Sequence, residues 1–237
     1  MAATAARLES RALRGIERRA LQAYDAVSVV SEVDRERLPG PHPRVLVCPN
    51  GWDPSPPLPG AADPVVVFVG LMGWTPNVDA AVWLVRSVWP RVRAKVPGAQ
   101  LRLVGREPAP AVQALAGEGV TVTGTVPAVA PHLEAARVVV APLRAGGGSR
   151  LKILEGLDAG RPVVATTVGA EGLEQLVGRG IVIEDDPVAY AEAIVRLLLD
   201  PHEAASLGAA GNQAVRETFA WDRTLAPLLE AVRSPGR

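Results

Sequence analysis

The stretch RVVVAPLRAGGGSRLKILEGLDAGRPVVAT, residues 137–166, decides the fold of this chain. Its ends, 137–141 and 162–166, are continuously apolar, as is typical of parallel strands that are covered on both faces. Between them, a run of glycines precedes a helical pattern that starts near Ser149. The stretch therefore predicts a strand, a glycine-rich turn, a helix and a second strand, which is the repeating unit of a parallel α/β sheet.

The same alternation continues on both sides of this unit. Further buried strands are predicted by the apolar runs 65–69, 101–104, 120–122 and 181–183. Helices are expected to begin near Pro76, Pro110, Ala128, Ala170, Pro187 and His202. Strands and helices that alternate with short connections indicate an α/β fold with a doubly wound parallel sheet and right-handed crossovers.

The residues before this sheet predict a separate, smaller layer. An amphipathic helix of about four turns is expected between Leu8 and Tyr24, followed by strands at 26–31 and 44–50 with a short helix near 32–38. Residues 53–64 contain five prolines, a composition typical of extended linkers. The expected organisation is a partial α/β layer (1–53), a Pro-rich linker (54–64), the main sheet domain (65–218) and a C-terminal helix (219–237) that packs back on the N-terminal part.

Composition excludes several classes of protein. Apolar residues make up 48% of the 237-residue chain, enough for a sizeable core, and 25 basic residues balance 25 acidic ones. Without net charge, attraction to nucleic acid is not indicated. Cys48 is the single cysteine, which excludes an intramolecular disulfide and a cysteine-rich zinc site and fits a cytoplasmic protein.

The N-terminal helix leaves two interpretations open. No run approaches the roughly 20 apolar residues needed to span a bilayer, and the N-terminus is expected to be neither a signal peptide nor an anchor. Its arginines and its apolar stripe fit a surface helix that lies on its own sheet. They also fit a helix that makes peripheral contact with a membrane or a lipid-linked substrate, at the inner face of the membrane.

Ligands of such a sheet bind beyond the carboxyl ends of its strands. The loops there are GLMGWTPN (70–77), GREP (105–108), GTVP (124–127) and PLRAGGGSR (142–150), and each contains glycine. In the last loop, a helix that starts near Ser149 would present unpaired N–H groups to an anion. Arg150 adds a guanidinium suited to phosphate.

Lys152 and Glu155 lie three residues apart and so share one face of this helix. A nucleoside diphosphate would meet all of these groups, because its ribose hydroxyls can both donate to a carboxylate. The alternative is a flexible glycine loop followed by a surface Lys–Glu ion pair. P-loop, H-E-x-x-H and G-x-S-x-G motifs are absent, and His42, His132 and His202 lie in turn or helix-start contexts, so no metal site is expected.

Several segments together resemble a known family. FVGLMGWTPNVDAAVWL, LRLVGREP, VTVTGTVPAVAPHLEAARVVVAPLRAGGGSRLKILEGLDAGRPVVATTVGAEGL and FAWDRTLAPLL resemble the Rossmann-like C-terminal domain of GT-B-fold glycosyltransferases of the group 1 (family 4) type. Within that family they are similar to exopolysaccharide-associated sugar transferases. The resemblance covers roughly residues 25–232. DAVSVVSEVDRERL and VLVCPNGWD resemble the end of such an enzyme's N-terminal domain, most of which is then missing.

The resemblance implies roles for individual residues. Glu155 resembles the ribose-binding glutamate, and Arg150 and Lys152 are the expected catalytic residues, which stabilise phosphate charge. The other residues expected to contact the nucleotide sugar are Gly147, Gly148 and Ser149 in the turn, Gly70 and Leu71 under the phosphates, and Gly105, Arg106 and Val126 beside the nucleobase. Two departures are visible: Gly147 stands where the family commonly has a second glutamate, and GLMGWTPN lacks a basic residue that many relatives carry.

The implied activity is transfer of a sugar, with retention, from a nucleotide-diphosphate donor to a glycan or lipid-linked acceptor. The donor is a substrate, and neither a cofactor nor a metal is expected. A partner chain that completes the N-terminal domain is a further expected partner. Two alternatives stay open: a truncated, inactive nucleotide-sugar-binding domain, and a sugar-nucleotide epimerase, which is disfavoured because GGGSRLKILEG resembles the transferases.

Overall fold

The computed structural model describes residues 2–148 and 150–233, with side chains from residue 12 onward. The chain divides into two compact units. The smaller unit joins the residues up to Gly51 with those from Trp221 onward, and the larger unit is Trp52–Ala220. Each unit is described by itself below.

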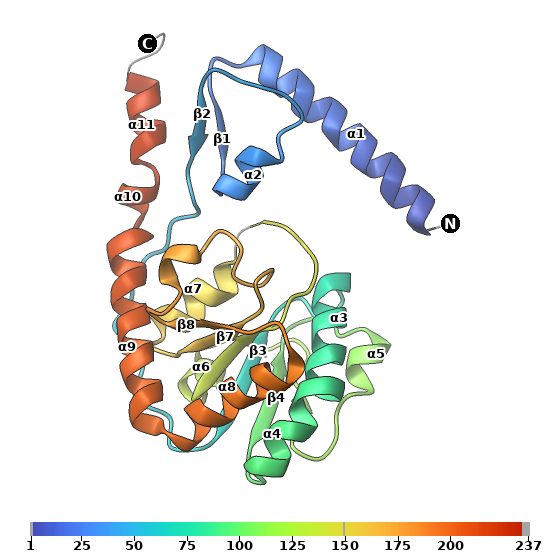
Figure 1. The fold of residues 1–237 in the computed structure, drawn as a ribbon, viewed down its shortest axis with the longest axis vertical. Helices are drawn as coiled ribbons and strands as arrows, with labels where there is room; N and C mark the ends of the chain where they lie inside the picture. The colour runs from blue at the N-terminus through green and yellow to red at the C-terminus, as the bar shows by residue number, and fades with distance from the viewer. Residues whose placement is uncertain (1, 149, 234–237) are drawn as a thin grey trace. The chain divides into compact units, whose positions relative to one another are not determined.

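The larger unit contains a six-stranded parallel sheet, which confirms the predicted fold class. Its strands are β3 (Val65–Val69), β4 (Gln100–Val104), β5 (Val120–Val122), β6 (Val138–Ala141), β7 (Val163–Ala165) and β8 (Ile181–Ile183). They lie in the order β5-β4-β3-β6-β7-β8, and every neighbouring pair is parallel. Each strand is followed by helical or turn segments that return the chain to the amino edge of the sheet (Figure 1).

Both faces of this sheet are buried. Val66 and Phe68 of β3 belong to one core cluster, while Val65 and Val67 belong to the other, because successive strand residues point to opposite faces. The first cluster includes residues of α3 (Thr75–Trp83), α4 (Trp89–Lys95) and α8 (Pro187–Leu199). The second includes residues of α6 (Ala130–Glu134), α7 (Leu151–Asp158) and α9 (Pro201–Thr218). Continuous apolarity in the strands thus reflects burial on two sides.

Two predicted helices differ from the structure. The helix expected near Ser149 begins at Leu151, with Arg150 as its N-cap. The helix expected near Ala170 is wrong: that region forms turns and a short 3-10 segment, Glu174–Leu176. Gly172 has φ +84°, a backbone conformation that a right-handed helix does not contain. The remaining segments are α5 (Pro110–Gln113) and a π-helical segment, Leu84–Val88, between α3 and α4.

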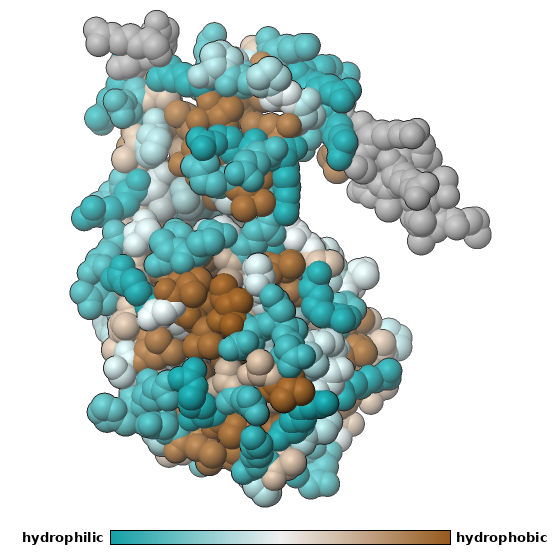
Figure 2. Space-filling model, in the orientation of Figure 1, coloured by the Kyte–Doolittle hydropathy of each residue, from teal (hydrophilic) through white to brown (hydrophobic). Residues whose placement is uncertain are grey.

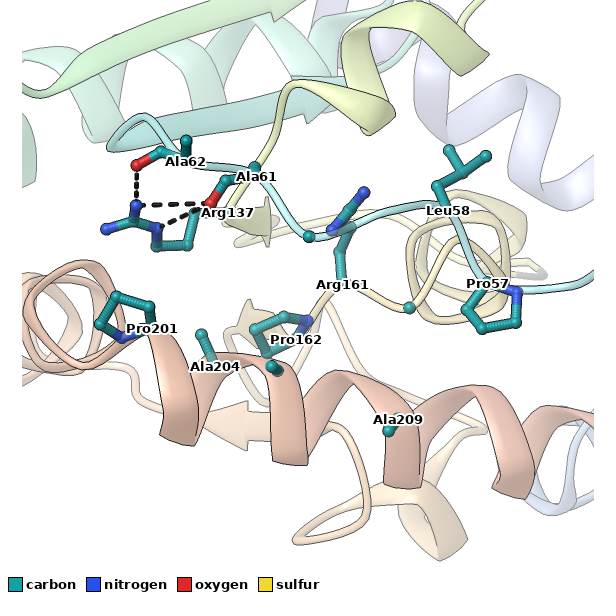
Figure 3. Close-up of a pocket in the computed structure, with 13 residues that line it drawn as sticks. Pro57, Leu58, Ala61, Ala62, Arg137, Arg161, Pro162, Pro201, Ala204 and Ala209 are labelled. Atoms are coloured by element: carbon teal, nitrogen blue, oxygen red, sulfur yellow. Dashed lines mark hydrogen bonds between the residues drawn. The ribbon is translucent and has the colours of Figure 1, made fainter.

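The Pro-rich segment expected as a linker belongs to the larger unit and is hydrogen-bonded to other parts of it. The Arg161 guanidinium donates to the carbonyl of Pro59. The Arg137 guanidinium donates to the carbonyls of Ala61 and Ala62 (Figure 3). A cavity of about 430 Å³ lies between this segment and α9. Arg137 and Pro162 precede β6 and β7, so this cavity lies at the amino end of the strands, opposite the predicted site.

The smaller unit is built around two short parallel strands, β1 (Val27–Val29) and β2 (Val45–Val47). Neither strand contains a buried residue, and Figure 2 shows apolar side chains at the surface in this part of the chain. The unit also contains four helices in its described residues: α1 (Ala2–Ala23), α2 (Glu32–Glu36), α10 (Trp221–Thr224) and α11 (Ala226–Arg233), of which α11 packs on β2.

Helix α1 is longer than predicted, at 22 residues. Ile16 on its predicted apolar stripe and the nearby Leu13 are 55% and 52% exposed. Packing on its own sheet, one of the two interpretations left open above, is therefore not seen at these two residues. Among the described residues, no helix is both long enough and apolar enough to cross a membrane.

Candidate nucleotide-binding site

The order of the strands creates a topological switch point beside β3, and we refer to the region between the loops on its two sides as the crevice. This strand pairs with β4 on one side and with β6 on the other, so the chain leaves β3 in one direction and later returns to its other edge. Loops that follow strands on the two sides of such a switch point diverge, and ligands bind between them. The loops concerned are those after β3 and β6, and both contain predicted site residues.

The loops after β3 and β4 lie in direct contact. The Gly70 amide donates to the Val104 carbonyl at 2.9 Å, and the Met72 amide donates to the Arg106 carbonyl at 3.0 Å. Gly105 has φ +150°, and a Cβ atom there would lie 1.7 Å from the Gly70 carbonyl oxygen. Only a glycine permits this approach.

The structure therefore brings four of the predicted residues together: Gly70, Leu71, Gly105 and Arg106. Leu71 and Arg106 are exposed. Val126 follows β5, which pairs with β4 at the edge of the sheet, and it packs against the second core cluster. Its contact with a nucleobase stays a prediction.

The glycine turn after β6 is exposed and tightly bent. Gly146 and Gly148 have φ values of +115° and +89°, in the region that favours glycine. A Cβ at Gly146 would lie 3.1 Å from the Trp74 ring, so this turn runs against the loop that follows β3. Gly147 is exposed between them, and Ser149 lies outside the described residues.

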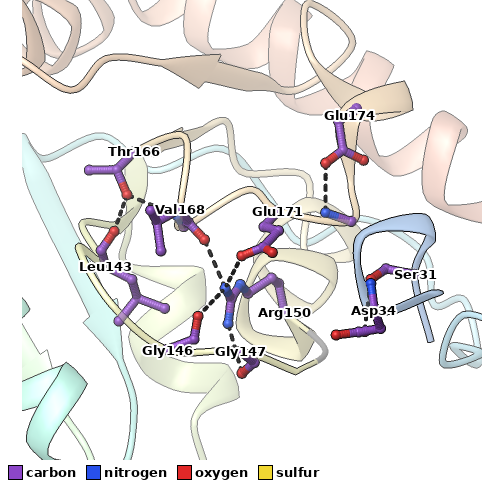
Figure 4. Close-up of polar contacts among 12 residues, drawn as sticks. Ser31, Asp34, Leu143, Gly146, Gly147, Arg150, Thr166, Val168, Glu171 and Glu174 are labelled. Atoms are coloured by element: carbon purple, nitrogen blue, oxygen red, sulfur yellow. Dashed lines mark hydrogen bonds and ion pairs between the residues drawn. The ribbon is translucent and has the colours of Figure 1, made fainter. Parts of the chain in front are cut away.

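Arg150 is buried, with 4% of its surface exposed. Its guanidinium donates to the carbonyls of Gly147 at 3.0 Å, Gly146 at 3.2 Å and Val168 at 2.8 Å, and lies 3.4 Å from the Glu171 carboxylate (Figure 4). The side chain thus holds the glycine turn to the loop after β7. We expected this guanidinium to face a diphosphate, but the structure directs it to the backbone of the two loops.

Lys152 lies one residue inside α7 and reaches toward β3. Its ammonium donates to the Asn77 side-chain oxygen at 2.7 Å and lies 4.8 Å from the centre of the Phe68 ring. Lys152 forms no ion pair with any residue that the structure describes. Burial, and secondarily the charge of Arg150, lower its pKa from 10.5 to about 8.

Glu155 is partly buried, one turn further along α7. Burial raises the pKa of its carboxyl group. Its carboxylate has no hydrogen-bond or ion-pair partner among the residues that the structure describes. The surface ion pair between Lys152 and Glu155, one of the two interpretations of the sequence, is therefore not formed, because Lys152 contacts Asn77 instead.

Sequence reasoning missed three residues that build the site. Asn77 holds Lys152, Glu171 contacts Arg150, and the Thr166 hydroxyl bonds the Leu143 carbonyl and accepts from the Gly169 amide at 2.9 Å. A polar residue in the first turn of the helix after β3 was a usable signal for Asn77. The other two join loops that the sequence separates widely. Over the described ranges, no group of three or more His, Cys, Asp or Glu side chains gathers as metal ligands would.

Comparison with known proteins gives the family. Residues 63–200, which are more than half of the chain and include all six strands of the larger sheet, match the family described as group 1 glycosyl transferases. The chain belongs to this family. The glycine turn, Lys152 and Glu155 all lie inside the matched residues.

The chain is also similar in sequence to individual glycosyltransferases. The chain is 29% identical, over 252 aligned residues, to a GDP-mannose-dependent alpha-(1-6)-phosphatidylinositol monomannoside mannosyltransferase of Mycobacterium tuberculosis. The match covers 93% of this chain and 64% of that relative, so the chain spans less than two thirds of the relative's length.

Solved structures share the GT-B fold. A Staphylococcus aureus TarM mutant, in complex with fondaparinux, alpha-GlcNAc-glycerol and UDP, superposes with a TM-score of 0.77 at 18% identity, covering 90% of this chain and 45% of TarM. A sucrose-phosphate synthase from Thermosynechococcus elongatus gives a TM-score of 0.73 at 25% identity, covering 93% of this chain and 60% of the synthase.

Proposed function

We propose that this chain binds a nucleotide-diphosphate sugar and transfers the sugar to a glycan or lipid-linked acceptor. One observation carries the proposal: Lys152 and Glu155, of opposite charge and one turn apart on α7, do not pair with each other and lie at the carboxyl end of the sheet. Burying charges without a counter-charge costs stability. A ligand with both phosphate oxygens and ribose hydroxyls would stabilise both groups.

The position of each group supports a specific orientation of the donor. The diphosphate would lie at the start of α7, near the helix N-terminus, the exposed glycine turn and the Lys152 ammonium. The ribose would lie one turn along the helix, with its two hydroxyls donating to the Glu155 carboxylate. Gly70 and Leu71 would line the opposite side, below the phosphates. The UDP in the TarM complex and the GDP-mannose in the mannosyltransferase's name support this class of donor.

The chemistry requires stabilisation of the leaving diphosphate. As the bond to the sugar breaks, negative charge grows on the phosphate oxygens and the sugar becomes oxocarbenium-like, as in glycoside hydrolysis. Lys152 would donate to these oxygens, and a single preorganised donor of this kind contributes about 2.7 to 4 kcal/mol in other enzymes. Arg150 would act indirectly, by holding the glycine turn. Transfer with retention and without a required metal is part of the proposal.

A lipid-linked acceptor is supported by the mannosyltransferase relative, whose name specifies a phosphatidylinositol monomannoside. It also gives α1 a role. Arg14, Arg18 and Arg19 are exposed on this helix together with Leu13 and Ile16. Basic and apolar side chains on one exposed helix favour contact with an anionic membrane surface.

A second candidate is a domain that binds the donor and transfers nothing by itself. It is favoured by the coverage of 64%, since the relatives contain sequence that this chain does not match. In that case a partner chain would supply the acceptor side.

Isothermal titration calorimetry with UDP and with GDP tests the proposed site. The wild type is expected to bind at least one of them, and Lys152→Met and Glu155→Gln are each expected to weaken binding about tenfold, equivalent to about 1.4 kcal/mol. Lys95→Met is the matched control, because Lys95 is exposed and lies outside the crevice. A transfer assay with radiolabelled UDP- and GDP-sugars and lipid extracts then separates the two candidates. Binding that Lys95→Met weakens as much as Lys152→Met would contradict the site.

A further inference from the structure

Asn77 connects the two sides of the crevice. It lies in the first turn of α3, with 3% of its surface exposed. Its side-chain nitrogen donates to the Leu71 carbonyl at 2.9 Å, and its side-chain oxygen accepts from the Lys152 ammonium at 2.7 Å. One amide therefore joins the loop after β3 to helix α7, which follows β6.

Among the described residues, the Asn77 side-chain oxygen is the hydrogen-bond acceptor of the Lys152 ammonium. The charged groups around it give no compensation: Arg150 carries the same charge, and Glu155 makes no ion pair with it. On α3, the Asp79 carboxylate is bound by Arg144, with nitrogen–oxygen distances of 2.6 and 3.0 Å. The Phe68 ring and the Asn77 oxygen are then the favourable contacts that the structure gives to this ammonium.

The loop after β3 is built around the same amide. A Cβ atom at Gly70 would lie 2.7 Å from the Asn77 nitrogen, so the backbone of this loop passes directly over the side chain. A larger residue at 70, or a rotated amide at 77, would move the Leu71 carbonyl. The position of the loop and the position of the ammonium are therefore fixed together.

We propose that Asn77 is a positioning residue of this site, which holds the Lys152 ammonium and the Leu71 segment in one arrangement across the crevice. The identity of the anion that would meet the ammonium, a diphosphate, rests on the proposed function. The contact between Asn77 and Lys152 does not, and it can be tested in the free protein.

The titration of Lys152 can be measured directly, because Lys95 and Lys152 are the two lysines of the chain. In protein labelled with ¹³C-lysine, NMR titration of the ε-carbons gives two resonances, of which the exposed Lys95 is an internal reference. Asn77→Ala removes an acceptor worth about 1 kcal/mol to the charged form and is expected to lower the Lys152 midpoint by about 0.7 pH units. The near-isosteric Asn77→Asp places a carboxylate at the same oxygen position and is expected to raise the midpoint by one unit or more.

Asn212→Ala is the matched control, because Asn212 is also a buried asparagine, at 6% exposed, and its side chain bonds the Asp158 carbonyl on the other face of the sheet. It is expected to lower stability and leave the Lys152 midpoint unchanged. A midpoint that stays fixed in both Asn77 variants, or that moves equally in Asn212→Ala, would overturn the proposal. If Asn77→Ala does not fold, Asn77→Asp alone decides.

The same variants separate this inference from the proposed function. With UDP or GDP at pH 7.5, Asn77→Ala is expected to bind five- to tenfold more weakly than wild type, while Asn212→Ala binds normally. Shifted midpoints without nucleotide binding by any variant or by the wild type would support the role of Asn77 at the ammonium and contradict the proposed function.

Discussion

Nucleotide binding is predicted to take up a proton at Lys152. The pKa of this group falls from 10.5 to about 8 on burial, so at pH 8 about half of the free molecules carry a neutral amine. A shift of about 2.5 units corresponds to about 3 kcal/mol against the charged form. A diphosphate beside the ammonium reverses this cost, so binding and protonation are coupled.

Calorimetry at pH 8, in buffers of different ionisation enthalpy, measures this coupling directly. We expect uptake of about half a proton per nucleotide, and an affinity that falls by up to tenfold per pH unit above pH 8. Lys152→Met is expected to abolish both effects, while Lys95→Met retains them. Wild-type affinity that is constant between pH 7 and 9, without proton uptake, would refute the assignment of Lys152 to the phosphates.

The same shift predicts how stability changes with pH. Because the folded pKa of about 8 lies below the unfolded value of 10.5, the unfolded chain binds more protons between these values. The Lys152 contribution to the free energy of unfolding therefore rises with pH across this window. Below pH 8, the buried positive charge destabilises the folded protein by its full amount. Lys152→Met is expected to be more stable than wild type at pH 7, by about 1 to 2 kcal/mol once the lost bond to Asn77 is counted. Urea unfolding at pH 7 and pH 10 checks this, and a difference that does not shrink at pH 10 would contradict it.

Three further predictions concern the rest of the crevice. Glu155→Gln is expected to weaken UDP or GDP binding about tenfold and to leave pyrophosphate binding unchanged, since the carboxylate is assigned to the ribose; equal losses in calorimetry would contradict this. Arg150→Ala leaves three loop carbonyls without their donor and is expected to cost about 2 to 4 kcal/mol in urea unfolding and to lower turnover roughly a hundredfold or more; a stable variant with normal turnover would show that the loops do not need it. Gly105→Ala forces a Cβ onto the Gly70 carbonyl and is expected to cost at least about 2 kcal/mol, whereas Gly117→Ala, with open space around it, is expected to cost less than about 1.

The fold was predictable because its strands are buried on both faces. Runs such as 65–69 and 137–141 carry no alternation that could be confused with an exposed sheet, and proline or glycine separates them from the helices. The start of α7 was misplaced by two residues, because a backbone with positive φ at Gly148 cannot be distinguished by sequence from the first turn of a helix. The helix expected near Ala170 failed for the same reason at Gly172.

The candidate site was only partly predictable. The spacing of Lys152 and Glu155 alone predicts that they share one face of a helix. Glycines that follow the predicted strands indicate which loops could bind a ligand. The direction of a long side chain does not follow from spacing. Arg150 has the chemistry of a phosphate ligand, yet its partners are carbonyls of the turn at 146–147 and of Val168, which a sequence does not place nearby.

The separation of Lys152 and Glu155 on α7 is consistent with the proposed donor site. A lysine and a glutamate three apart on an exposed helix would ordinarily pair for a few tenths of a kcal/mol. Here the Lys152 ammonium is hydrogen-bonded to Asn77. Burial lowers the pKa of Lys152 and raises the pKa of Glu155, and both shifts favour the neutral form. In the proposed complex, a molecule with phosphate at one end of a pentose would contact both charged groups. If Lys152→Met and Glu155→Gln together stabilised the protein and left nucleotide affinity unchanged, this explanation would fail, and the separation of the two charges would have to be a product of packing.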